Sequence, residues 1–247
     1  MTDSSGKAST NRPRVMLKCS GEALMGDTGF GIDFTTLNQI AADIAAASHA
    51  GVGMAVVVGG GNLFRGLKTA AEGMDRASAD HMGMLATVMN GLALADTLNR
   101  LGCRASAWSA IPMPTVCRPY IRAEALAALD AGEVVICVGG TGNPFFTTDT
   151  AAALRAAELD CGLIAKATQV DGVYSADPKK DPDAVRYDRL TFDQVLAQNL
   201  AVMDTAAFAL ARENHIPVMV FALDGPHAIV EALTGRGRST TIDVALD

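Results

Sequence analysis

The sequence lacks a long apolar run, a basic excess and a charged-then-apolar leader, and each absence removes a class of protein. No uninterrupted apolar stretch approaches the roughly 18 residues of a membrane helix. Lys and Arg number 20 against 27 Asp and Glu, and the net charge of -7 argues against general binding of nucleic acids or anionic membranes. We therefore expect a cytoplasmic protein without membrane contact, in which any anionic ligand needs a local basic pocket.

Cysteine and histidine patterns typical of disulfides or metal sites are also missing. The cysteines are five in number, an odd count, and show no CxxC spacing. Four of them lie in or beside apolar runs, which predicts buried thiols in a reducing compartment. The histidines show no metal spacing, so no protein metal site is expected. The cysteines are Cys19, Cys103, Cys117, Cys137 and Cys161.

The usual nucleotide fingerprints are absent as well. The chain contains no GxxxxGK[ST] motif, and neither GDTGFG nor the triple-glycine segment GGGNLFRG completes GxGxxG. If this protein binds phosphates, it does so by other means.

What the sequence does contain is an alternation of strand-like and helical patterns. Hydrophobic residues make up 49% of the 247 residues, which is enough for a sizeable core. Residues 1–13 form a polar tail that we expect to be disordered. We predict one α/β domain over residues 14–247, with a mostly parallel sheet and helices on both faces. The predicted strands cover 15–21, 53–58, 104–110, 134–138, 162–167, 218–222 and 240–244, and the helices 33–49, 75–101, 124–129, 149–158, 192–198, 204–214 and 226–233.

Glycine-rich turns follow two of these strands. Gly139, Gly140 and Gly142 remove side chains where the strand ending at Val138 stops, and Gly59–Gly61 do the same after Val58. Three successive glycines favour a close backbone contact with phosphate over a packing role. The residues Thr147, Thr148 and Asp149 then open an alanine-rich helix, and a helix N-terminus beside a glycine turn favours anions. The alternative is an ordinary strand, turn and capped helix.

Basic residues lie near the same predicted strand ends. Lys18 stands near the end of an apolar strand and must reach water or an anion, while Arg65 is within reach of the triple-glycine turn. Because ligands gather at the carboxyl ends of parallel strands, Lys18 and the segments 59–65, 139–149 and 168–177 predict one cleft.

The predicted helix over 75–101 is apolar on two sides. One stripe contains Met82, Leu85, Met89 and Leu92, and the other contains Met84, Val88, Gly91, Ala95 and Leu98. One face should meet the sheet. The other, thinned by Gly83 and Gly91, is either a subunit interface through residues 86–98 or part of a monomer core.

Long segments of the chain resemble a known family. The motifs LKCSGEAL, GGGNLFRG, DHMGMLATVMNGLAL, TGNPFFTTD, KATQVDGVYSADP and VMDTAAFALAR resemble those of the bacterial uridylate (UMP) kinases of the amino-acid-kinase family, from Arg14 nearly to the C-terminus. The resemblance implies the α/β/α sandwich of that family and direct transfer of a phosphoryl group from ATP to UMP, with Mg²⁺ accompanying ATP. It places the chain in de novo pyrimidine nucleotide (CTP) biosynthesis as a homohexamer made of three dimers. GTP would activate the enzyme and UTP would inhibit it.

The same resemblance implies roles for particular residues. Lys18 supports the transferred phosphoryl group, Asp204 orients Lys18, and Arg65 completes the catalytic set. The UMP site would consist of Gly60, Arg65, Asp80, Thr141, Gly142, Asn143, Pro144, Phe145, Phe146, Thr147 and Thr148. The ATP site would consist of Lys18, Cys19, Ser20, Gly21, Gly61, Arg65, Lys166, Thr168, Tyr174 and Asp177. The loop linked to GTP would be Gly26, Asp27, Thr28, Gly29, Phe30 and Gly31.

Simpler explanations remain open for the charged residues. Asp204 can be a helix N-cap, Lys18 a strand-end lysine that reaches water, and Asp80 a carboxylate that favours the positive end of a helix dipole. For the function of the whole chain, two alternatives to a UMP kinase remain.

One is a carboxylate kinase of the same fold, acting on acetylglutamate or aspartate. The other is a storage protein that binds oxyanions without transferring them.

Overall fold

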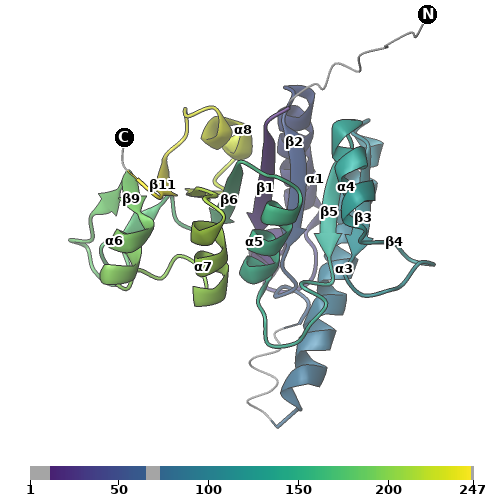
Figure 1. Ribbon diagram of the computed structural model, residues 1–247, viewed down its shortest axis with the longest axis horizontal. Helices are drawn as coiled ribbons and strands as arrows, with labels where there is room; N and C mark the ends of the chain where they lie inside the picture. Colours follow the sequence, from purple (N-terminus) through teal and green to yellow (C-terminus); the bar gives the residue numbers. More distant parts are fainter. Residues whose placement is uncertain (1–11, 65–72, 246–247) are drawn as a thin grey trace, which may run out of the picture.

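A single mixed sheet runs through the centre of the molecule (Figure 1). In the computed structural model, which describes residues 12–64 and 73–245, this sheet has nine strands, and β7 and β8 form a separate pair. Arg65 and the predicted tail up to residue 11 lie outside the described residues. The strands are β1 (Arg14–Cys19), β2 (Gly53–Val58), β3 (Ala105–Ser109), β4 (Arg118–Pro119), β5 (Val134–Val138), β6 (Leu163–Thr168), β7 (Val173–Tyr174), β8 (Arg186–Tyr187), β9 (Arg189–Thr191), β10 (Val218–Ala222) and β11 (Ser239–Asp243).

Helices follow most of these strands, as a parallel sheet requires. They are α1 (Phe34–His49), α3 (Arg76–Arg100), α4 (Arg122–Asp130), α5 (Thr148–Glu158), α6 (Phe192–Ala197), α7 (Thr205–Glu213) and α8 (Ala228–Leu233), with short 3₁₀ turns η1 (Gly21–Leu24) and η2 (Gly26–Thr28). Several of them begin with a side-chain cap. The Asp33 carboxylate accepts the Thr36 N–H at the start of α1, and the Thr147 hydroxyl accepts the Asp149 and Thr150 N–H groups at the start of α5.

The strand order brings distant segments together. It runs β4-β3-β5-β2-β1-β6-β10-β11-β9, and all pairs are parallel except β10 with β11. In the register of β1 with β6, Lys18 stands directly opposite Lys166. Side chains at paired positions point to the same face of the sheet. Two lysines therefore lie side by side at the same end of the two central strands.

Helices cover both faces of the sheet, which confirms the predicted α/β/α architecture. One core layer packs α1, α3 and α8 against residues such as Leu17, Val56 and Ile136. The opposite layer packs α4, α5, α6 and α7 against Met16, Val57 and their neighbours. No helix within the described residues has the length and apolarity needed to cross a bilayer.

The structure differs from the sequence-based prediction mainly in small elements. The strands β4, β7, β8 and β9 were not predicted, because a strand of two or three residues shows no periodicity. The final strand β11 pairs antiparallel with β10, which makes the sheet mixed at one edge. The other predicted strands and helices are present with boundaries shifted by one or two residues in most cases.

The two apolar stripes of α3 have different environments. Val88 and Leu98 are buried in the core of the chain, and a Cβ atom at Gly91 would lie 2.2 Å from Val138 Cγ1. Gly91 therefore packs against β5, so of the two alternatives left open for this face, the core is right and the interface is wrong. The stripe that contains Met89 is exposed instead.

Candidate active site

Two glycine turns stand at the carboxyl ends of β2 and β5, at the edge of the sheet predicted to hold a ligand. The prediction that the first turn has no packing role is wrong for two of its three glycines. A Cβ atom at Gly59 would lie 2.7 Å from Gly21 N, and one at Gly60 would lie 2.8 Å from Gly83 O. At Gly61 the nearest atom would be Glu22 Cγ at 3.8 Å. Close packing thus explains Gly59 and Gly60, whereas a Cβ atom at Gly61 would make only an ordinary van der Waals contact.

Buried polar side chains of α3 hold both turns in place. Asn90 Nδ2 donates to Gly59 O at 2.7 Å, and Asn90 and Asn62 form a reciprocal amide pair with distances of 2.7 and 3.1 Å. Thr87 Oγ1 accepts the Gly139 N–H at 2.9 Å. These residues were not predicted from the sequence, although two polar side chains, Asn90 and Thr87, on an otherwise apolar helix face are a visible signal. Their hydrogen bonds fix the spacing between the two turns.

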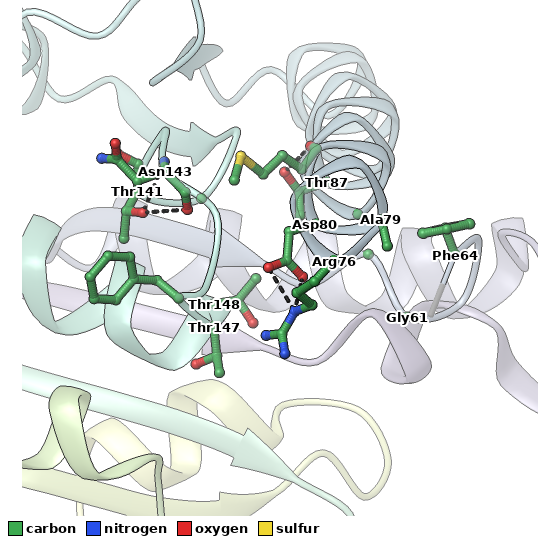
Figure 2. A pocket seen from close by; sticks show the side chains of 15 residues that line it. Gly61, Phe64, Arg76, Ala79, Asp80, Thr87, Thr141, Asn143, Thr147 and Thr148 are labelled. Carbon is green, nitrogen blue, oxygen red and sulfur yellow. Dashed lines mark hydrogen bonds and ion pairs between the residues drawn. The ribbon is translucent and has the colours of Figure 1, made fainter. Parts of the chain in front are cut away.

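A cavity of about 440 Å³ lies between these turns and the first turns of α3 (Figure 2). It brings together seven of the eleven residues that the resemblance assigns to UMP. Gly142, Pro144 and Phe145 do not line the cavity, and Arg65 lies outside the described residues. Its lining consists of Gly60, Gly61, Phe64, Arg76, Ala79, Asp80, Gly83, Met84, Thr87, Gly140, Thr141, Asn143, Phe146, Thr147 and Thr148.

The carboxylate of Asp80 is a strong hydrogen-bond acceptor in this cavity. Arg76 Nε lies 3.0 and 2.9 Å from its two oxygens, and the Phe145 N–H donates to Oδ2 at 2.8 Å. The helix itself is capped by Asp75, whose carboxylate accepts the Ser78 N–H at 2.9 Å. Asp80 is the fifth residue of α3, beyond the first turn where a helix dipole acts most strongly. A dipole role alone does not explain its place.

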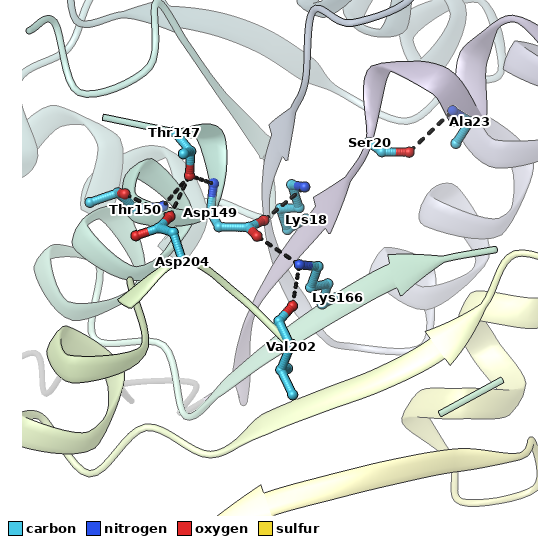
Figure 3. A network of polar contacts seen from close by, with 9 residues as sticks. All are labelled: Lys18, Ser20, Ala23, Thr147, Asp149, Thr150, Lys166, Val202 and Asp204. Atoms are coloured by element: carbon cyan, nitrogen blue, oxygen red, sulfur yellow. Dashed lines mark hydrogen bonds and ion pairs between the residues drawn. The ribbon is translucent and has the colours of Figure 1, made fainter. Parts of the chain in front are cut away.

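Two lysines and one carboxylate form the centre of the site (Figure 3). Asp149, in the first turn of α5, lies between the lysines of β1 and β6. Its Oδ1 is 2.7 Å from Lys18 Nζ, and its Oδ2 is 2.6 Å from Lys166 Nζ. The lysine side chains are 9% and 14% exposed, so all three groups are largely removed from water. Together they carry a net charge of +1, which an additional anion can compensate.

Burial and the pairing of charges shift two pKa values in this trio. Burial alone would raise the pKa of Asp149, but the ammonium groups of Lys18 and Lys166 outweigh burial, and the pKa lies below its usual value of 3.8. Burial lowers the pKa of Lys166 below its usual 10.5, because the attraction of Asp149 only partly offsets the loss of water. The carboxylate is therefore charged at neutral pH.

Asp204 does not form the predicted pair with Lys18. Its Oδ1 caps α7 by accepting the Ala207 N–H at 2.9 Å. Its Oδ2 accepts the hydroxyl of Thr150 at 2.9 Å and that of Thr147. Asp204 thus joins the N-termini of α5 and α7, and the carboxylate that contacts Lys18 is Asp149. The prediction of a Lys18–Asp204 pair is corrected accordingly.

A second cavity, of about 730 Å³, lies beside the carboxyl ends of β6 and β10. Thr168, from the predicted ATP set, lines it together with Gln169, Asp171, Leu223, Asp224 and Arg238. Tyr174 and Asp177 do not line it. The Tyr174 hydroxyl donates to Asp171 at 2.6 Å, and Asp177 accepts the Lys179 N–H at 3.0 Å on an exposed turn.

Three further residues of the predicted ATP set lie near the end of β1, while Gly61 lines the first cavity and not the second. Cys19 belongs to the hydrophobic core, where burial raises the pKa of its thiol to about 12, so only its backbone is available to a ligand. Gly21 packs against the triple-glycine turn. Ser20 caps η1, accepting the Ala23 N–H at 3.3 Å.

The loop predicted to respond to GTP is tied to the first glycine turn. Asn62 Nδ2 donates to Gly31 O at 2.7 Å, and the Gly31 N–H donates to Asn62 O at 3.0 Å. Phe30 is exposed at the tip of this loop. A change in the loop would therefore reach Asn62, Asn90 and the turn at Gly59.

Comparison with known proteins gives the class of this chain. A family model described as the amino acid kinase family matches residues 13–222, and the chain belongs to that family. Similar proteins include the uridylate kinase of Chelativorans sp. (strain BNC1), 58% identical over 93% of this chain and 93% of that protein. The uridylate kinase of Paramagnetospirillum magneticum is 57% identical over 93% and 95%.

Solved structures agree with this assignment. The UMP kinase from Ureaplasma parvum matches with a TM-score of 0.90 at 40% identity, covering 94% of this chain and 99% of that one. The UMP kinase from Bacillus anthracis gives a TM-score of 0.90 at 38% identity over 95% and 98%. The resemblance to bacterial uridylate kinases is thus confirmed over nearly the whole chain.

Proposed function

We propose that this chain transfers a phosphoryl group from ATP to UMP, forming UDP and ADP in pyrimidine nucleotide synthesis. The observation that carries the proposal is the Lys18–Asp149–Lys166 trio, which stands at the carboxyl ends of the two central strands. We call the cavity of about 440 Å³ the acceptor cavity; it is lined by Thr147 and Thr148, which directly precede Asp149. Thr168, which lines the second cavity, lies two residues after Lys166 on β6. UMP would occupy the first cavity and ATP the second.

The chemistry at this trio is alignment and charge compensation. A bond forms between a UMP phosphate oxygen and the γ-phosphorus as the bond from that phosphorus to ADP breaks. Lys18 and Lys166 would balance the negative charge that spreads over the transferred group. A UMP phosphate is already ionised near neutral pH, so no side chain has to remove a proton.

The residues of the site fit a metal that arrives with the nucleotide. Among the described residues, no group of three or more His, Cys, Asp or Glu side chains could hold a metal ion. Mg²⁺ is usually held by one or two carboxylates together with substrate phosphates, and this site offers the carboxylates of Asp149, within the trio, and Asp204, at the start of α7. Mg²⁺ bound in this way would neutralise phosphate charge.

An assay of ADP release with four acceptors tests the proposed function. We expect turnover with UMP and much lower turnover with CMP, acetylglutamate and aspartate. Turnover with acetylglutamate or aspartate instead would favour a carboxylate kinase. Tight binding of oxyanions without ADP release from any acceptor would favour a storage protein.

Asp80 should select ribose over deoxyribose. We expect the protein to prefer UMP over dUMP by at least about tenfold in kcat/KM, because a hydrogen bond to a charged acceptor contributes roughly 1.5 to 3 kcal/mol. Asp80→Asn should lose most of this preference while still accepting the Phe145 N–H. Kinetics with both nucleotides and a thermal melt measure the two effects. A variant that keeps the full preference and merely melts earlier would show that Asp80 only supports the loop.

We also propose that the exposed stripe of α3 binds a second copy of the chain, within a hexamer of three dimers. Met82, Leu85, Met89 and Leu92 project from one side of this helix and are 36% to 56% exposed. An apolar stripe of this length is unfavourable in water and suits a two-fold contact with the same helix of a partner. Residues of the other stripe, including Val88, are already buried within the chain.

Met89→Glu should dissociate the assembly without unfolding the chain. Met89 is 56% exposed, so a charge there is solvated in a monomer but buried in a dimer. Val88→Glu is the matched contrast, because Val88 is 5% exposed and a charge there should destabilise the fold itself. Light scattering gives the mass, and a thermal melt gives the stability. A wild-type particle of 25.6 kDa at micromolar concentration would contradict this proposal.

We also propose which nucleotides regulate this chain and where in the cell it acts. We infer that GTP activates and UTP inhibits, with loop 26–31 as the effector segment because Asn62, which donates to Gly31 O, directly follows the cavity-lining Gly61. A cytoplasmic location agrees with five free cysteines, of which four are buried.

A further inference from the structure

Arg76 lies in the acceptor cavity but has no role in the assignments above. It is the first residue of α3, where a cation is unfavourable because the N-terminus of a helix carries partial positive charge. The helix dipole therefore does not explain an arginine at this position. The contacts of the Arg76 side chain must therefore account for its presence.

The guanidinium of Arg76 contacts both Asp80 and Phe145. Its Nε lies 3.0 and 2.9 Å from the two carboxylate oxygens of Asp80, four residues along the helix. Its Cζ lies 5.7 Å from the centre of the Phe145 ring, within the range of a cation–π contact. Arg76 thus connects the start of α3 with the loop that forms the opposite wall of the cavity (Figure 2).

Phe145 has an unusual backbone that requires such support. Its φ angle is 72°, in the left-handed region that a residue with a bulky side chain rarely adopts. Its N–H donates to Asp80 Oδ2 at 2.8 Å. The neighbouring Asn143 and Phe146 line the cavity, so the conformation at Phe145 sets the shape of that wall.

The contacts of Asp80 leave limited room for a ligand. A carboxylate oxygen accepts about two hydrogen bonds. Oδ2 already receives the Phe145 N–H and shares the Arg76 Nε–H, while Oδ1 receives, from the described residues, only the other part of that shared bond. Among these residues, one acceptor position therefore remains, and it lies on Oδ1.

We propose that Arg76 is a positioning residue for the acceptor nucleotide. It holds the Asp80 carboxylate so that Oδ2 supports Phe145 while Oδ1 presents its remaining position to a sugar hydroxyl. Arg76 thus acts on ribose recognition through Asp80 and through the loop. This inference rests on the proposed function, because it assigns the acceptor's sugar to the cavity at Asp80.

Kinetics of two Arg76 variants test the proposal, with a matched control on the same helix. Arg76→Ala should raise KM for UMP by about tenfold, the scale of one charge-assisted hydrogen bond, and leave kcat within about twofold. The preference for UMP over dUMP should fall in parallel. Arg76→Lys should restore part of both. Arg100→Ala removes another Arg–Asp pair of α3, in which Nε lies 3.0 Å from Asp96 Oδ2, and should change neither.

Hydrogen exchange of the ligand-free protein gives an independent readout. In Arg76→Ala the amides of residues 141–147 should exchange faster, because the Asp80 carboxylate is no longer held against Phe145. In Arg100→Ala they should not. Unchanged KM, preference and exchange in Arg76→Ala would overturn the proposal, as would a lower melting temperature with normal kinetics. Absence of UMP turnover in the wild type would instead refute the proposed function, and the exchange result would still decide whether Arg76 holds Phe145.

Discussion

Replacing Lys18 with alanine should lower kcat by about 10²-fold or more while KM for UMP stays within a few-fold. We expect this loss because the Lys18 ammonium lies at the carboxyl end of β1, in the trio that we propose contacts the transferred phosphoryl group. Removal of one fixed electrostatic group from an active site commonly costs this much. Lys18 does not line the acceptor cavity, so binding of UMP should change little.

Lys18→Met serves as the second variant in this test, because it keeps most of the side-chain volume without the charge. The Lys18 side chain is only 9% exposed, so the volume matters for packing. Both variants should lose turnover to a similar degree if charge is decisive. Near-normal turnover in either, with an intact fold by circular dichroism, would refute the role of Lys18.

Replacing Asp149 with asparagine should affect stability as well as turnover. The carboxylate separates two ammonium groups that stand opposite each other on β1 and β6. Without its charge the two cations are left largely buried and uncompensated, a change that costs about 3 to 5 kcal/mol in comparable pairs. Urea unfolding should show this loss, and kcat should fall because the lysines are no longer held in place.

Asp204→Asn is the matched control for this prediction. Asparagine is a good N-cap, so α7 should keep its first turn and the loss of stability should stay below about 1 kcal/mol. If Asp204→Asn lost more stability and more turnover than Asp149→Asn, the pairing that sequence resemblance suggested would be right in solution.

The dependence on pH has a definite sign. Because the pKa of Asp149 is lower in the folded protein than its ordinary value of 3.8, this carboxylate stabilises the fold above that value. Its contribution falls as pH drops through the lowered folded value. In Asp149→Asn, this part of the acid destabilisation should be absent.

The comparison of sequence and structure shows which kinds of information a sequence contains. Local signals were reliable: the apolar strands and the glycine turn at Gly139 are properties of neighbouring residues. The partner of Lys18 could not be predicted from local signals, because it depends on the register of β1 with β6 and on where α5 begins. A carboxylate in the first turn of a helix also looks like an ordinary dipole contact, which concealed the role of Asp149.

Glycines and methionines were misread for a related reason. Close packing and close approach of a ligand both favour a residue without a Cβ atom. Gly59 and Gly61 therefore look alike in sequence, and only the atoms around them differ. The two stripes of α3 are both apolar, and only the packing of Gly91 on β5 shows which stripe faces inward. Arg76 showed no signal of its own, since an i,i+4 pair with Asp80 is common on exposed helices.

The two cavities draw on separate stretches of the chain, and this separation bears on how such a protein can evolve. Every described residue that lines the first cavity falls between Gly60 and Thr148, and every described residue that lines the second falls between Thr168 and Arg238. The trio at β1, β6 and α5 belongs to neither lining. Mutations in the earlier stretch can therefore alter which molecule is accepted while the later stretch and the trio stay under unchanged selection. Specificity for a new substrate can therefore evolve when the later stretch is conserved and the earlier stretch accumulates mutations.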